Sequence, residues 1–149
     1  MQTSSPWHWV AGSSPAMTNF IGLVLLVLTL APAHAYPAKE TEILSTTSYA
    51  VATAGQKNRK GAEAYCRQAK STVTTKPEEA YLFAHIERCF ALVADASGDK
   101  PTACKHFKKA LDVWTRTAPP NDHPQSVASR TALRTSMEQY RTANCAAKK

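Results

Sequence analysis

Apolar side chains after position 36 recur at intervals of three and four residues, a periodicity typical of α-helices that bury one face. The strict alternation of β-branched residues that marks strands is missing, and the chain has only 5 glycines. The pattern predicts an all-α fold of antiparallel helical hairpins, about five helices in all, arranged as a repeat stack or a small bundle.

Two helices are predicted before residue 74. The first covers roughly 40–56, with Gly55 marking its end. The second covers roughly 59–73. The run of serine, threonine and valine at 71–75 should end it, because β-branched and hydroxyl side chains compete with helical backbone hydrogen bonds.

A third helix is predicted from a capping box in which Thr75 is the N-cap and Glu78 the residue three positions on. Pro77 then falls in the first turn, where its missing N–H has no consequence. Ser97-Gly98 should end this helix.

A fourth helix is predicted to start at Asp99, acting as N-cap, with Pro101 in its first turn, and to end before Pro119-Pro120. A fifth is expected from His123-Pro124 to about Ala143. Its apolar face is weak, as suits a last helix that covers a core on one side and meets water on the other.

The first 35 residues differ from the rest because they contain no Lys, Arg, Asp or Glu. An apolar run through Leu23–Leu30 is followed by small residues that end at Ala35, the pattern of a secretory signal peptide cleaved after Ala35. The run is too short to span a bilayer. Translation could start at Met17, whose free amine would supply the positive charge that precedes such a run. We therefore expect a leader at 1–35 and a single helical domain at 36–149 with a short basic tail.

All four cysteines follow the predicted cleavage site, and an even number in a small exported domain indicates two disulfides. They are Cys66, Cys89, Cys104 and Cys145. Four cysteines allow three pairings. Antiparallel packing of the second and third helices favours Cys66–Cys89 with Cys104–Cys145, and Cys66–Cys104 with Cys89–Cys145 is the alternative.

Three residues of the second helix recur in the fourth with the same intervals, each 41 positions later: Ala62, Cys66 and Ala69 become Ala103, Phe107 and Ala110. With Ala91 and Gly98-Asp99, this pattern resembles the tetratricopeptide repeat, in its longer kinesin-light-chain type. Glu87 and Cys66 stand where that family has aromatic residues. The other interpretation is a helical bundle outside the family.

The resemblance implies a concave surface lined by the first helix of each hairpin. Exposed candidates on the third predicted helix are Tyr81, His85 and Arg88. Such a groove would bind a protein or peptide.

The whole net charge of +7 lies in residues 100–149, which carry ten basic and three acidic side chains. The candidates for a basic surface are Lys105, Lys108 and Lys109 on the fourth predicted helix and Arg130, Arg134 and Arg141 on the fifth. Such a surface would attract anionic polymers or lipid head groups. Nucleic acid is not expected as a partner, because few aromatic residues accompany these charges.

No catalytic or metal-binding motif is present, so we expect no enzyme activity, metal or cofactor. The sequence predicts a periplasmic or secreted, non-enzymatic module that binds an envelope protein or peptide. The alternative is a cationic factor that binds anionic envelope polymers or lipid head groups through its last two helices.

Overall fold

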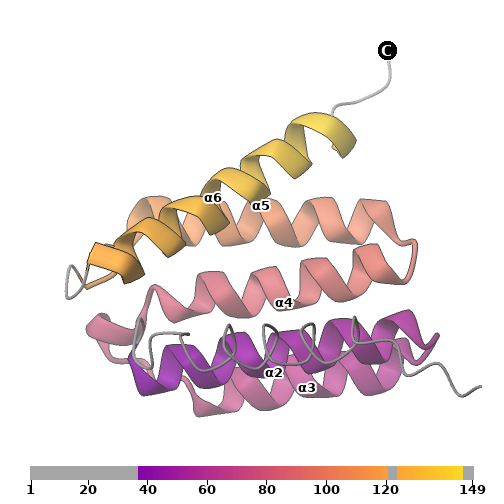
Figure 1. Cartoon of the computed structure of the whole chain (residues 1–149), viewed down its shortest axis with the longest axis horizontal. Helices are drawn as coiled ribbons and strands as arrows, with labels where there is room; N and C mark the ends of the chain where they lie inside the picture. The colour runs from indigo at the N-terminus through magenta and orange to yellow at the C-terminus, as the bar shows by residue number, and fades with distance from the viewer. Residues whose placement is uncertain (1–36, 121–123, 146–149) are drawn as a thin grey trace, which may run out of the picture. The chain divides into compact units, whose positions relative to one another are not determined.

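A computed structural model describes residues 37–120 and 124–145, which form five α-helices and one short 3₁₀ helix and contain no strand. The α-helices are α2 (Ala38–Gly55), α3 (Arg59–Thr72), α4 (Leu82–Ala96), α5 (Lys100–Arg116) and α6 (Pro124–Asn144) (Figure 1). The all-α prediction is confirmed. The predicted leader and the basic tail after Cys145 lie outside the described residues.

Two of the helices begin at side-chain caps 41 positions apart. Asn58 accepts a hydrogen bond from the Gly61 backbone N–H, and Asp99 accepts one from that of Thr102, as predicted for Asp99. The residue before each cap has a positive φ, 62° at Lys57 and 78° at Gly98. The hairpins α2–α3 and α4–α5 therefore turn in the same way.

The predicted start of the third helix is wrong. Thr75 does not cap it, and Pro77–Glu79 instead forms the 3₁₀ helix η1 ahead of α4. Glu79 accounts for the difference, because its carboxylate accepts hydrogen bonds from the backbone N–H and the hydroxyl of Thr74 and from Lys39 of α2. These contacts favour a separate turn over a continuous first helical turn.

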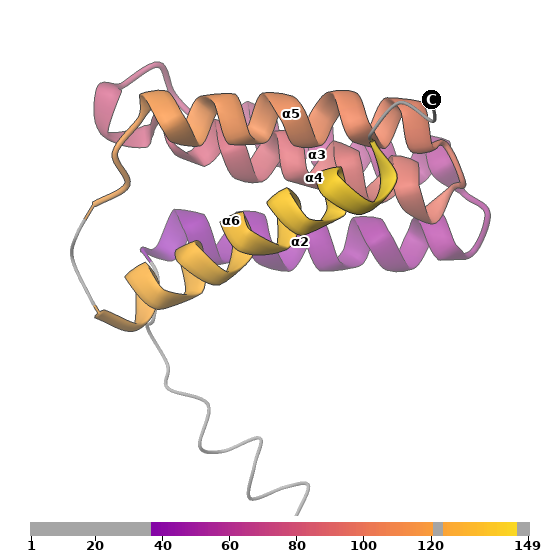
Figure 2. The same cartoon turned by 90° about the horizontal axis from the view of Figure 1, so that it is seen from above.

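The hairpins pack so that α2 and α4 run in the same direction. The first turn of α2 contacts the start of α4 through Glu40 and Tyr81, while Ala50 and Ala54 pack with Val93 near the other end. Helix α6 packs mainly on α5 and crosses the hairpins obliquely (Figure 2).

Small side chains let the helices approach closely, since alanines make up much of the buried core. The triplet residues all lie inward: Ala62, Cys66, Ala69, Ala103, Phe107 and Ala110 are buried. The predicted inward faces of α3 and α5 are thus confirmed. Membership of the tetratricopeptide family stays a prediction.

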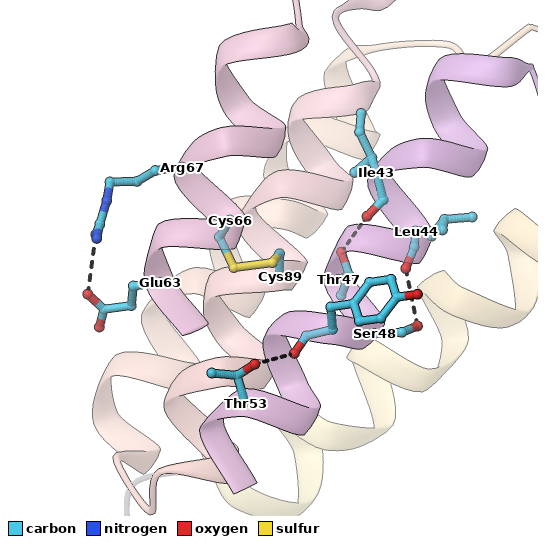
Figure 3. The surroundings of a disulfide bond; sticks show 10 residues. Ile43, Leu44, Thr47, Ser48, Thr53, Glu63, Cys66, Arg67 and Cys89 are labelled. Atoms are coloured by element: carbon cyan, nitrogen blue, oxygen red, sulfur yellow. Dashed lines mark hydrogen bonds and ion pairs between the residues drawn. A yellow bond between two sulfur atoms is a disulfide. The ribbon is translucent and has the colours of Figure 1, made fainter. Parts of the chain in front are cut away.

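Both disulfides join helices that are neighbours in space. Cys66–Cys89 links α3 to α4 with Cα atoms 5.8 Å apart, and Figure 3 shows it beside α2, which carries Ile43 and Thr47. Cys104–Cys145 links α5 to the residue after α6, with Cα atoms 5.6 Å apart. Of the two pairings left open by the sequence, the structure contains the one favoured by antiparallel packing.

Candidate functional site

A buried carboxylate, Glu40, lies at the centre of a polar cluster formed by three helices. Arg130 Nε donates to Glu40 Oε1 at 3.0 Å, and Arg130 Nη2 donates to Oε2 at 2.6 Å. His85 Nε2 lies 2.8 Å from Oε1, and the Tyr81 hydroxyl donates to Oε2 at 3.1 Å. Because an ionised carboxylate only accepts, the proton of the His85 ring lies on Nε2.

Helix geometry brings these side chains together. Glu40 is in the first turn of α2, while Tyr81 and His85 lie four residues apart at the start of α4 and so share a face. Arg130 comes from the second turn of α6 and also donates to the Pro120 carbonyl at 2.6 Å. Its guanidinium lies 5.2 Å from the centre of the Tyr81 ring, a cation–π contact.

Glu40 is ionised in the folded protein because of the groups around it. Burial by itself raises the pKa of Glu40, but hydrogen bonds and charges from His85 and Arg130 outweigh burial and lower that pKa to about 2. The side chains of Glu40 and His85 are fully buried, and that of Arg130 is 3% exposed. A cluster enclosed in this way holds helices together and offers no surface to a substrate.

Two buried polar atoms of the described residues have no hydrogen-bond partner, His85 Nδ1 and Ser126 Oγ. Ser126 precedes Arg130 by one helical turn, and His85 shares the Glu40 carboxylate with Arg130. Ser126 Oγ therefore lies where α6 meets the hairpins, while the His85 ring also packs edge-on against Trp114 of α5.

The predicted groove is not open in this structure. Tyr81 and His85 are buried and Arg88 is half-buried, so the first two are wrong as exposed candidates. The physical reason is that Glu40 binds both side chains and Arg130 of α6 closes over them.

Glu40 was missed by the sequence-based site prediction, although a signal was present. The buried positions of α2 are 40, 43, 47, 50 and 54, so Glu40 continues the helical spacing of the inward face by one turn. A carboxylate in line with an apolar stripe indicates a buried partner of opposite charge.

Five of the six basic-surface candidates are exposed, and they are Lys105, Lys108, Lys109, Arg134 and Arg141. Arg130 is the exception and is wrong as a surface residue, because it pairs with buried Glu40. Arg134 is exposed but pairs with Glu138 at 3.0 Å.

The Cys104–Cys145 disulfide lies beside two of these exposed basic residues, Lys108 and Arg141. Lys108 follows Cys104 by one helical turn, and Arg141 precedes Cys145 by one turn, so charges from both helices flank the bond. A shallow hollow of about 380 Å³ beside it is lined by Glu138, Arg141, Thr142 and Cys145. Open, charged and shallow, this surface suits electrostatic contact with an extended anion.

A second histidine pairs with a carboxylate, outside the Glu40 cluster. His106 Nδ1 lies 2.7 Å from Glu87 Oε2, and the His106 ring stacks on Phe90. No group of three or more His, Cys, Asp or Glu side chains in the described ranges is arranged to hold a metal ion. The described helices include none long and apolar enough to cross a membrane.

No protein-family model matches the chain, and no similar protein is found among curated proteins or among solved structures.

Proposed function

We propose that the mature protein is a non-enzymatic binding module that works outside the cytoplasm and contacts anionic polymers or lipid head groups of the cell envelope through its basic surface. The observation that carries this proposal is the exposure of Lys105, Lys108 and Lys109 on α5 together with Arg134 and Arg141 on α6. The only exposed acidic residues in the described parts of these two helices are Asp112 and Glu138.

Export is supported by the leader pattern at 1–35 and by the two disulfides, since disulfides persist in oxidising compartments. Intact mass of the protein from its native envelope fraction tests this part. We expect a chain that begins at Tyr36 and has the mass of two disulfides. A reduced chain that retains residues 1–35 would contradict export.

Binding to vesicles tests the surface. Mature protein should bind vesicles that contain anionic lipid and not neutral ones, and raising the salt concentration should weaken binding because exposed charges are screened. A variant with Lys105→Gln, Lys108→Gln and Arg141→Gln should bind on the order of a hundredfold more weakly, at ~1 kcal/mol for each charge near the surface.

A matched control removes the same charge elsewhere. Lys57, Lys60 and Lys76 are exposed and lie on or near the α2–α3 hairpin. Their replacement by glutamine should affect binding much less than the α5–α6 triple variant does. Equal losses in both triple variants would show that net charge, and not this surface, governs binding.

A second candidate function is binding of an envelope protein or peptide. It is favoured by the way in which α6 covers the face of α2, α4 and α5, because α6 buries there a charged side chain, Arg130, and a serine hydroxyl without a partner, Ser126. This face accommodates a helix, and the imperfect fit of α6 leaves room for a partner helix to compete for it.

A further inference from the structure

Helix α6 is fastened to each of three other helices by a specific polar or covalent contact. Arg130 binds Glu40 of α2, the Tyr140 hydroxyl donates to Asp95 of α4, and Cys145 is bonded to Cys104 of α5. Figure 2 shows the resulting path, from beside the first turn of α2 obliquely toward the start of α5.

Apolar contacts contribute little to holding α6 in place. Met137 is the one fully buried apolar side chain among its described residues, and Leu133 and Tyr140 are partly buried against the same cluster. Val127 is 38% exposed. By contrast, α5 buries Ala103, Phe107, Ala110, Leu111 and Trp114. Helix α6 therefore depends on its polar contacts and its disulfide more than the hairpin helices do.

The fit of α6 is also chemically incomplete. Ser126 of α6 is fully buried, and its Oγ has no hydrogen-bond partner. Buried polar atoms without partners disfavour the arrangement that contains them. A helix with an apolar residue at the position of Ser126 would fit this face better than α6 does.

We propose that the face of α2, α4 and α5 beneath α6 is a binding site for an amphipathic helix of a protein partner that presents an arginine to Glu40, and that α6 is its displaceable intramolecular occupant. The proposal rests on the second candidate function and is independent of the basic surface. The motif of α6 defines the ligand chemistry: arginine, then apolar residues three and seven positions on, as in Arg130, Leu133 and Met137.

Glu40 provides the specificity of the site. Its two carboxylate oxygens receive two nitrogens of one guanidinium, a geometry that lysine cannot reproduce. The Cys104–Cys145 bond opposes displacement of α6, because it keeps α6 tethered at both ends and so at a high effective concentration over the face.

The test supplies the helix in trans to a full-length mature chain whose own α6 is weakened. This chain carries Cys104→Ser, Cys145→Ser and Arg130→Gln and keeps the Cys66–Cys89 bond. A fluorescent peptide of residues 124–144 should bind it saturably and raise its melting temperature. The same peptide with Arg130→Gln should bind about thirtyfold or more weakly. Oxidised wild-type protein should bind the unaltered peptide more weakly than this variant does, because its own α6 competes for the face.

Equal affinity for the two peptides, or no binding to the folded variant, would overturn the proposal. A chain with only Cys104→Ser and Cys145→Ser covers the case in which the first variant does not fold. Hydrogen exchange should then be faster in α6 than in α4 and α5. Exchange at one rate throughout, or loss of all helices, would make α6 a permanent part of the core and would also refute the proposal.

Failure of the site and failure of the function are separable. If the peptide binds but no envelope protein is cross-linked to the Cys104→Ser, Cys145→Ser chain, the site is real and the second candidate function is wrong. If the peptide does not bind while an envelope protein is cross-linked at another surface, the function survives without this site.

Discussion

At the scale of single residues, the stability of the fold depends strongly on one buried carboxylate. Transfer of a carboxylate out of water costs several kcal/mol of free energy unless charges and hydrogen bonds replace its contacts with water. Glu40 receives that replacement from Arg130, His85 and Tyr81. The cluster therefore holds α6 against α2 through the specific ion pair of Arg130 with Glu40 and not through burial of apolar surface.

Replacing Arg130 by methionine should lower the free energy of unfolding by about 3–5 kcal/mol, because Glu40 loses its charged partner while it stays buried. Combining it with Glu40→Leu should recover part of the loss. Urea unfolding measures the free energy of unfolding of the single and the double variant. Trp114 fluorescence follows it, because the Trp114 ring centre lies 5.2 Å from that of His85. Arg134→Met is the control, because Arg134 forms an exposed pair with Glu138. It should change the free energy of unfolding by less than about 1 kcal/mol. The Glu40→Leu variant is measured alone as well. A double variant whose loss equals the sum of the Arg130→Met and Glu40→Leu losses would contradict this coupling.

Acid should destabilise the protein in a defined range. The pKa of Glu40 is about 2 in the folded protein against an ordinary value of 4.5, so its stabilising contribution is complete above pH 4.5 and is lost as the pH falls toward 2. The pKa of Glu79 is also lowered to about 2, by Lys39 and Thr74. Glu40→Gln should therefore flatten only part of the decrease in unfolding free energy between pH 5 and pH 2.5. An unchanged slope would mean that Glu40 does not titrate in this range.

At the scale of helices, the two hairpin turns are equivalent in conformation and differ in sequence. Glycine takes a positive φ readily, so Gly98 suits its φ of 78°, whereas Lys57 adopts a φ of 62° with a side chain that disfavours it. Both turns lead into an N-cap, Asn58 and Asp99. The first hairpin is thus formed despite a strained turn residue.

Exchanging the residue types at these turns should change stability in opposite directions. Lys57→Gly should raise the free energy of unfolding by roughly 0.5–1 kcal/mol, and Gly98→Ala should lower it by a similar amount. A Cβ at Gly98 would meet no described atom within 4 Å, so its effect reports the backbone alone. Gly55→Ala is the control, because this helical glycine is equally uncrowded and its replacement should stabilise α2. Equal signs for Lys57→Gly and Gly98→Ala would contradict the strain argument.

At the scale of the whole molecule, covalent bonds link helices that a small core alone would hold weakly. Cys66–Cys89 joins the two hairpins, and Cys104–Cys145 joins α6 to the second hairpin. Each bond closes a loop of the unfolded chain and reduces its conformational freedom. The two disulfides and the Glu40 cluster, which joins α2 to His85 of α4 and Arg130 of α6, together connect every helix from α2 to α6.

Removal of either disulfide should lower the free energy of unfolding by about 2–4 kcal/mol. The Cys66→Ala, Cys89→Ala variant should loosen all helices together, because both sulfurs lie fully buried between the hairpins. The Cys104→Ala, Cys145→Ala variant should loosen α6 first. Urea unfolding gives the magnitudes, and hydrogen exchange by mass spectrometry locates the change. Uniform loosening in the second variant would show that α6 unfolds only with the whole domain.

The sequence by itself determined the positions of those helices whose ends and inward faces depend on neighbouring residues. The intervals of the apolar residues placed α2, α3, α5 and α6 within a few residues, Asp99 was identified as a cap, and the alanine–aromatic–alanine spacing identified the inward face of α5. These features depend on residues within one or two helical turns, so a linear pattern contains them. The start of α4 was wrong because Glu79 is held partly by Lys39, 40 positions away.

Only the tertiary structure decided what the polar residues do. Glu40 and Arg130 are 90 positions apart, so the place of Glu40 on the inward face of α2 indicates a buried cationic partner but not which residue it is. Helical periodicity reports which face is buried but not which helix covers it, so the oblique path of α6 and the burial of Tyr81 and His85 were not predictable from spacing. The physical reason is that a charge is stable in a core only beside its partner, and the fold alone brings the two together.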